Sequence, residues 1–137
     1  MAKTTKIKNM REIKFRGKTI NGDWVFGNYA HIKKDFSTVK KGHYISNSAG
    51  SPFAYMVRSE TLGQFTGLKD NSGKDIFEGD IIKTGTDKPM VILWSNKYAS
   101  FCLDRHGWAF SHWFGESCDP TDVEIIGNIH DNPELLK

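Results

Sequence analysis

Short runs in which apolar and polar residues alternate, separated by turn residues, cover most of the chain. Residues 11–16 alternate in this way, which predicts a half-buried strand. Asn21-Gly22 is a strong hairpin turn signal, and the residues after it place Trp24 and Phe26 on one face of a second strand. The N-terminal part is therefore predicted to contain a β-hairpin.

Similar signals continue towards the C-terminus. Residues 70–73 predict the turn of another hairpin, because Asp and Asn side chains bond to nearby backbone and Gly accepts a positive φ. The apolar run 91–95 predicts a buried strand, and Asn132-Pro133 predicts a short helical turn after the last strand. Other strands are expected at 53–61, 81–83, 100–104 and 123–130.

These strands define the expected fold class. Short strands with frequent turns and no long amphipathic helix indicate a mainly β protein, all-β or α+β. The expected architecture is a small barrel or sandwich of antiparallel strands and hairpins. Three parts are expected: a flexible basic leader over 1–9, an N-terminal β subdomain over 10–58 and a barrel-like C-terminal β subdomain over 59–137. The pattern leaves open whether the two subdomains share one core.

Composition removes several other classes. Aromatic residues make up 12% of the 137 residues, which argues against disorder because large rings bury much surface. No run reaches the length of a membrane span, so no membrane contact is expected. Two cysteines are too few for a disulfide scaffold, which favours a reducing compartment and a cytoplasmic location.

Charge is distributed unevenly along the chain. Residues 1–43 contain eleven Lys/Arg and three Asp/Glu, a net +8, whereas residues 44–137 contain eight basic and thirteen acidic residues, a net −5. One interpretation is a basic segment that meets phosphates or an acidic partner. The other is that the two halves attract each other, within one chain or between subunits.

Three segments of the chain are distinctive: MREIKFRGKTINGDWVFGNY at 10–29, GQFTGLKDNSGKDIFEGDIIK at 63–83 and VEIIGNIHDNPELL at 123–136. They resemble the YopX family of phage and prophage proteins. The resemblance implies a phage or prophage origin, a mostly β fold and a place in the cytoplasm of a bacterial host. It implies no established activity and no catalytic residues.

Two groups of side chains are candidate contact residues. Basic and aromatic character combine in Lys14, Arg16, Lys18 and Trp24, a set suited to a ligand or nucleic acid. Lys14 and Arg16 are expected to share the solvent face of the first strand. Trp108, Trp113 and Phe114 belong to a dense aromatic stretch, interpreted as buried core, as an interface or as a platform on which bases stack.

The sequence offers little support for metal or catalytic chemistry. Residue types that suit zinc occur at Cys102, His106, His112 and Cys118, but their spacing matches no short-knuckle pattern. No metal, cofactor or catalytic residue is therefore expected. A hydrolase that uses Asp75, Glu78 and Asp80 is a distant alternative, because carboxylates at turns are ordinary turn chemistry.

The expected function is that of a phage-encoded accessory protein that binds rather than catalyses. Its expected partner is a host or phage protein, and self-association is also expected because short strands leave sheet edges unpaired. The alternative is a nucleic-acid or nucleotide-binding protein that uses the basic N-terminal half.

Overall fold

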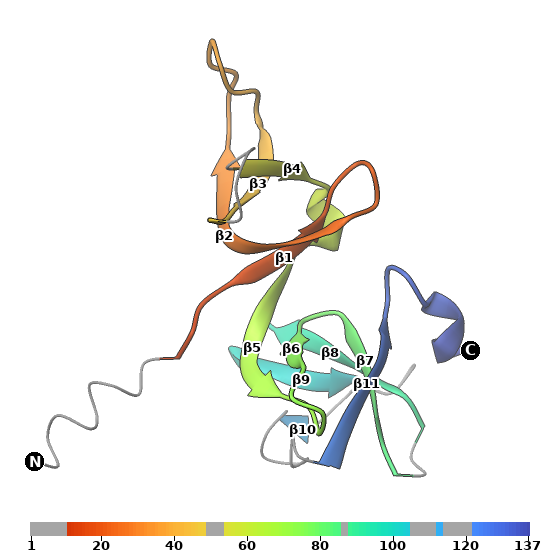
Figure 1. Ribbon diagram of the computed structural model, residues 1–137. Helices are drawn as coiled ribbons and strands as arrows, with labels where there is room; N and C mark the ends of the chain where they lie inside the picture. Colours follow the sequence, from red (N-terminus) through yellow and green to blue (C-terminus); the bar gives the residue numbers. More distant parts are fainter. Residues whose placement is uncertain (1–10, 49–53, 86–87, 105–111, 114–121) are drawn as a thin grey trace, which may run out of the picture.

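The strands form two antiparallel sheets (Figure 1). This computed structural model describes residues 11–48, 54–85, 88–104, 112–113 and 122–137. The first sheet has the order β4 (Ala54–Val57), β3 (Gly42–Ser46), β2 (Trp24–Ile32), β1 (Phe15–Lys18), β5 (Gly63–Lys69) and β6 (Asp75–Phe77). The second has the order β10 (His112–Trp113), β9 (Ser100–Asp104), β8 (Met90–Ser95), β7 (Asp80–Thr84) and β11 (Val123–Asn128).

The mainly β class is confirmed, and among the described strands neither sheet closes into a barrel. Helical structure in the described residues is limited to short 3₁₀ segments, which include η1 (Ser59–Thr61) and η3 (Pro133–Leu136). The second of these is the predicted C-terminal helical turn, with Pro133 at its start.

Both predicted hairpin turns are confirmed. Gly22 has a φ of 90° between β1 and β2, which pair antiparallel, and Gly73 has a φ of 86° between β5 and β6. The first strand differs from its prediction, because β1 begins at Phe15 rather than at residue 11. The strand β3 was not predicted at all.

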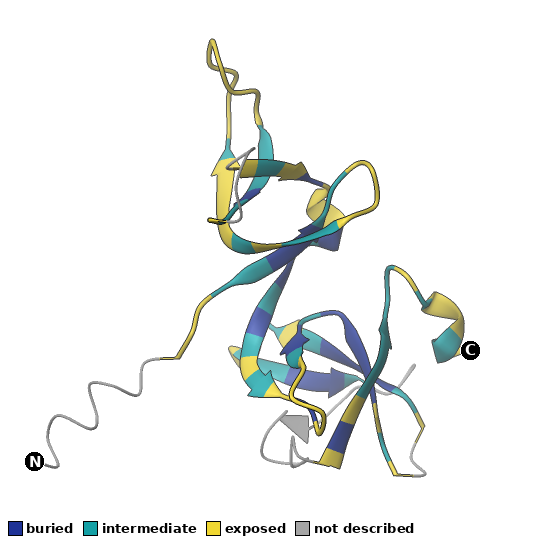
Figure 2. Cartoon of the chain, viewed as in Figure 1, coloured by how far each residue is buried: buried dark blue, intermediate teal, exposed yellow. Residues whose placement is uncertain are grey.

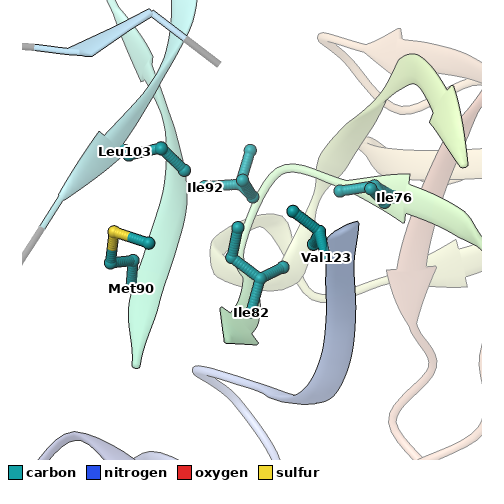
Figure 3. Close-up of a cluster of buried hydrophobic side chains, with 6 residues drawn as sticks. All are labelled: Ile76, Ile82, Met90, Ile92, Leu103 and Val123. Atoms are coloured by element: carbon teal, nitrogen blue, oxygen red, sulfur yellow. The ribbon is translucent and has the colours of Figure 1, made fainter. Parts of the chain in front are cut away.

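A hydrophobic core lies where β6 meets the second sheet (Figure 3). The buried side chains of this core are Ile76, Ile82, Met90, Ile92, Leu103 and Val123. They come from β6, β7, β8, β9 and β11, so the last strand of the first sheet and four strands of the second share one core. The buried strand predicted at 91–95 is wrong in one respect, because Trp94 is 43% exposed.

The first four strands curl back on themselves. Val57 at the end of β4 forms an isolated bridge with Thr19, and the Arg58 amide donates a hydrogen bond to the Lys18 carbonyl at 2.8 Å. The β2–β3 hairpin projects from this part, and much of it is exposed (Figure 2). The first sheet contains strands from both sides of residue 58, and the division into subdomains there stays a prediction.

Candidate functional site

Three cations of the predicted contact set face the C-terminal half of the chain. Lys14, Arg16 and Lys18 lie two residues apart at β1, so their side chains project from one face. Each makes an ion pair with a carboxylate: Lys14 Nζ with Asp75 at 2.6 Å, Arg16 Nη1 with Asp80 at 2.7 Å, and Lys18 Nζ with Asp131 at 2.5 Å. Lys14 and Arg16 share a face as predicted, but Arg16 does not meet solvent, because acidic segments cover it and leave it 7% exposed.

Arg16 is the buried centre of this arrangement. Its guanidinium carbon lies 4.7 Å from the centroid of Trp24 and 5.1 Å from that of Phe77, so both aromatic rings contact the cation. Its Nη2 donates a hydrogen bond of 3.4 Å to the Glu78 carbonyl. Its Nε is buried and has no hydrogen-bond partner among the described residues. The cation is thus held by one carboxylate and two rings.

Both carboxylate oxygens of Asp80, at the start of β7, have partners. One carboxylate oxygen binds Arg16, and the other accepts a hydrogen bond of 2.8 Å from the Phe77 amide. Burial raises the pKa of Asp80, while the Arg16 charge and the hydrogen bond from Phe77 act in the opposite direction. The pair therefore joins β1 to the tight turn between β6 and β7.

Trp24 also turns towards the C-terminal half. Its Nε1 donates a hydrogen bond of 2.8 Å to Asp131, whose other carboxylate oxygen binds Lys18. Hydrogen bonds from Lys18 and Trp24 lower the pKa of Asp131 to about 2. The four predicted contact residues are therefore brought together, but in contacts within the chain.

Lys14 lies between two carboxylates at the exposed end of the same face. Its Nζ lies 2.5 Å from Glu12 and 2.6 Å from Asp75, and hydrogen bonds to Asp75 and Glu12 raise the pKa of Lys14. Asp75 also binds Lys69 Nζ at 2.7 Å. Burial opposes ionisation of Asp75, but the hydrogen bonds from Lys14 and Lys69 lower its pKa.

A cavity of about 580 Å³ opens beside these pairs. Its apolar wall includes Phe26 and Phe77 of the first sheet and Ile125 and Ile126 of β11. Its charged lining residues include Lys14, Arg16, Asp75 and Asp80. The register of β11 against β7 shifts between Ile125 and Gly127, so a β-bulge forms this wall. Most of the charge in this cavity is already neutralised by ion pairs.

A cavity of about 260 Å³ lies beside the other face of β1. The described residues that line it are Phe15, Tyr29, Leu62, Gly63, Gln64, Glu78 and Trp94. They come from both sheets, because Trp94 belongs to β8 and most of the others to the first sheet or its connections. Glu78 is the only charged side chain among them.

Glu78 differs from the other two carboxylates of the hydrolase alternative. Asp75 and Asp80 line the larger cavity, whereas Glu78 lines the smaller one. Its Oε1 accepts a long hydrogen bond of 3.4 Å from the Gln64 amide. Burial raises the pKa of Glu78, against that hydrogen bond and the charge of Arg16. The three carboxylates therefore do not gather in one cavity.

Sequence reasoning missed the aromatic side chains of the smaller cavity. The sequence placed Phe15 in a half-buried strand and Trp94 in a buried one, without indicating that both line a cavity. Period two does place Phe15 on the face of β1 opposite Arg16. One local signal indicated that Trp94 is exposed: it lies at the end of an apolar run, directly before a polar turn.

The predicted aromatic interface falls largely outside the described residues. Trp108 and Phe114 lie outside them, and Trp113 belongs to β10, where it pairs with Cys102 by backbone register. The interface therefore stays a prediction.

The four residues of types that suit zinc also lie partly outside the described residues. His106 and Cys118 lie outside the described residues, and His112 belongs to β10, where it pairs with Leu103 by register. Cys102 is a free, buried cysteine whose Sγ lies 3.5 Å from Ser100 Oγ. Within the part of the chain that the structure describes, no three His, Cys, Asp or Glu side chains are grouped to hold a metal ion.

The described fold and its cavities define a small, mainly β protein in which acidic segments cover a basic first strand. A family model described as "YopX protein" matches residues 14–137, so the chain belongs to the YopX family. The resemblance carried by the three sequence segments is confirmed.

A solved structure supports the fold. The crystal structure of protein EF1440 from Enterococcus faecalis is similar to this chain with a TM-score of 0.53 and 25% sequence identity. The similarity covers 93% of this chain and 100% of that one. No curated protein matches the sequence. In the described residues, no helix is long and apolar enough to cross a membrane.

Proposed function

We propose that the chain is a non-catalytic binding module that acts on a host or phage protein in the bacterial cytoplasm. One observation carries the proposal: the three cations of the predicted contact set are paired with carboxylates of the same chain, while aromatic side chains remain exposed beside the smaller cavity. Tyr29 is 37% exposed and Trp94 is 43% exposed. Exposed aromatic rings beside a cavity are typical of protein-binding surfaces.

Part of the charge asymmetry of the sequence has an internal explanation that supports the same proposal. Lys14, Arg16 and Lys18 lie in the basic half, and each binds a carboxylate of the acidic half. Nucleic-acid binding through these residues would require the pairs to break, which is most costly for the buried Arg16–Asp80 pair. This weakens the nucleic-acid alternative, and the enzymatic alternative has no further support.

The experiment is affinity capture with the immobilised full chain from a nuclease-treated bacterial lysate. We expect a defined protein complex that survives nuclease treatment and is lost in Trp94→Ala. Phe36→Ala is the matched control, because Phe36 is also an exposed aromatic residue, at 53%, but does not line the smaller cavity. Recovery of nucleic acid instead, with binding that falls steeply as salt rises, would favour the alternative.

Self-association is part of the proposal, since β4 forms an outer edge of the first sheet. Size-exclusion chromatography with light scattering tests it on the purified full chain. An oligomer that holds its mass on dilution supports it, and a monomer at all concentrations contradicts it.

A further inference from the structure

The smaller cavity contains a carboxylate, that of Glu78, that forms no ion pair within the part of the chain that the structure describes. Glu78 is half-buried, and its ionised form is costly to keep there without a cation. Among the described residues, the ion pairs involve other carboxylates, and none includes Glu78. A cation that enters this cavity could form a direct ion pair with Glu78, in addition to the longer-range effect of the Arg16 charge.

Aromatic rings form much of the remaining wall. Phe15, Tyr29 and Trp94 line the cavity, and the other lining residues are uncharged. The faces of aromatic rings carry partial negative charge, so rings and carboxylate favour the same kind of ligand. The cavity is complementary to a positive charge on a flat or slender apolar stem.

The rings are held in place before any ligand arrives. Phe15 and Tyr29 contact each other with centroids 5.6 Å apart and planes at 51°, and Tyr29 Oη lies 2.7 Å from His43 Nδ1. Trp94 contacts the edge of Phe101, with centroids 5.0 Å apart. Walls fixed in this way lose little conformational entropy on binding.

We infer that the smaller cavity receives an arginine side chain of the protein partner, with its guanidinium against the aromatic rings and paired with the Glu78 carboxylate. The inference rests on the proposed function and names the chemistry of the partner. A guanidinium is preferred to an ammonium because it is flat, weakly hydrated and able to bind a carboxylate through two parallel hydrogen bonds. Its stem is long enough to reach into a cavity of about 260 Å³.

The molecule contains the same chemistry on the opposite face of β1. There Arg16 contacts the rings of Trp24 and Phe77 and pairs with the Asp80 carboxylate. That site is filled by the protein's own arginine. The smaller cavity offers rings and a carboxylate with no arginine of its own among its lining residues.

The inference is tested with two pentapeptides that differ only in the charge of one side chain. One is acetyl-Gly-Gly-Arg-Gly-Gly-amide, and the other has citrulline, a neutral isostere, in place of arginine. Calorimetric titration of the full chain measures affinity, and the side-chain Nε1–H signal of Trp94 in nuclear magnetic resonance spectra locates the site. We expect the arginine peptide to shift the Trp94 signal and to bind at least roughly tenfold more tightly than the citrulline peptide.

Variants separate the carboxylate from a general charge effect. Glu78→Gln is expected to weaken arginine-peptide binding roughly tenfold. Glu124→Gln is the control, because Glu124 is an exposed residue of β11 that does not line the cavity. It makes the same charge change and is expected to leave the affinity unchanged. Thermal unfolding of both variants shows that each is folded at the temperature of the titration. Tyr29→Leu supplies a second variant, because it removes one ring without a change of charge.

The outcomes distinguish this inference from the proposed function. Equal binding of the arginine and citrulline peptides, equal binding of a third pentapeptide with lysine in place of arginine, or no binding at all would overturn the inference. If the captured protein complex nevertheless forms and Glu78→Gln leaves it intact, the proposed function stands without the inferred arginine contact. If the peptide binds as expected and no protein is captured, the proposed function fails while the cavity's preference for guanidinium is supported.

Discussion

At the scale of single residues, Arg16 shows how a buried charge is retained in this fold. Asp80 supplies the opposite charge, Glu78 a carbonyl, and Trp24 and Phe77 the faces of two rings. The ion pair offsets the loss of hydration for both partners only while both are present. The structural importance of Arg16 follows from that dependence.

Replacement of Arg16 by Met tests this dependence. We expect a loss of about 3–5 kcal/mol in the free energy of unfolding, because Asp80 would stay buried without its cation. The double variant Arg16→Met/Asp80→Asn should lose much less than the sum of the two single variants, since it leaves no unpaired charge. Urea unfolding followed by circular dichroism measures each value. A cycle in which the two losses simply add would contradict the account.

Asp131 gives a second test at this scale, through pH. Its pKa in the folded protein is about 2, below the ordinary value of 3.8, so its ionised form is favoured by folding. The stability from Asp131 is therefore fully present above pH 3.8 and is lost as the pH falls through about 2. Lys18→Met should raise the pKa of Asp131, because Lys18 is the largest cause of the shift. A carboxyl-carbon magnetic resonance titration measures it, and an unchanged pKa in Lys18→Met would refute the assignment.

At the scale of elements, turn residues were the most reliable signals in the sequence. The turns at Gly22 and Gly73 require positive φ, a local property that the residue type itself reveals. The strand β3 has no such signal, because its residues Gly42–Ser46 are mixed in polarity and its partners β2 and β4 determine it. Local chemistry predicts turns, and long-range pairing decides which segments between them become strands.

The turn between β5 and β6 also binds an element distant in sequence. Asp70 Oδ1 accepts hydrogen bonds from the Ser72 amide and hydroxyl and from the Lys74 amide, all at 2.9 Å. Asp70 Oδ2 accepts a bond of 3.2 Å from the Ile125 amide of β11. Burial opposes ionisation of Asp70, but bonds from Lys74, Ile125 and Ser72 lower its pKa.

Asp70→Asn is expected to destabilise the protein by about 1–3 kcal/mol, because an amide group cannot accept hydrogen bonds on both sides of the side chain. The Asn NH₂ group would face either the turn amides or the Ile125 amide. Asp23→Asn is the control, since it makes the same change in the exposed turn between β1 and β2 and should cost little. Chemical unfolding of both variants measures the difference, and equal losses would show that charge rather than acceptor geometry matters.

At the scale of the whole molecule, the opposite charges of the two halves meet within one chain. The sequence revealed the asymmetry and left open whether the partner of the basic half was internal, and three ion pairs now join the two halves within one chain. The segments that carry the family resemblance contribute both sides of all three pairs. The sequence could identify these residues, but not their pairing, because each pair joins residues more than fifty positions apart.

The cavities were beyond sequence reasoning for a related reason. Phe15, Tyr29, Glu78 and Trp94 are separated along the chain and are brought to one cavity by the contact between the two sheets. Apart from the polar turn that follows Trp94, nothing in the local pattern around these residues distinguishes a cavity wall from a core position. Their chemistry becomes interpretable only when the sheets are placed beside each other.

The same connections predict how the molecule unfolds. The first sheet includes strands on both sides of residue 58, β6 contributes Ile76 to the core of the second sheet, and Arg16 joins β1 to β7. Unfolding of residues 10–58 alone, or of residues 59–137 alone, would expose buried surface of the remaining part and break the buried ion pair. We therefore expect one cooperative transition, with tryptophan fluorescence and far-ultraviolet circular dichroism giving the same midpoint in urea. Arg16→Met should lower that midpoint for both probes together. Two separated transitions in the unmodified chain would instead show that residues 10–58 and 59–137 fold as independent subdomains.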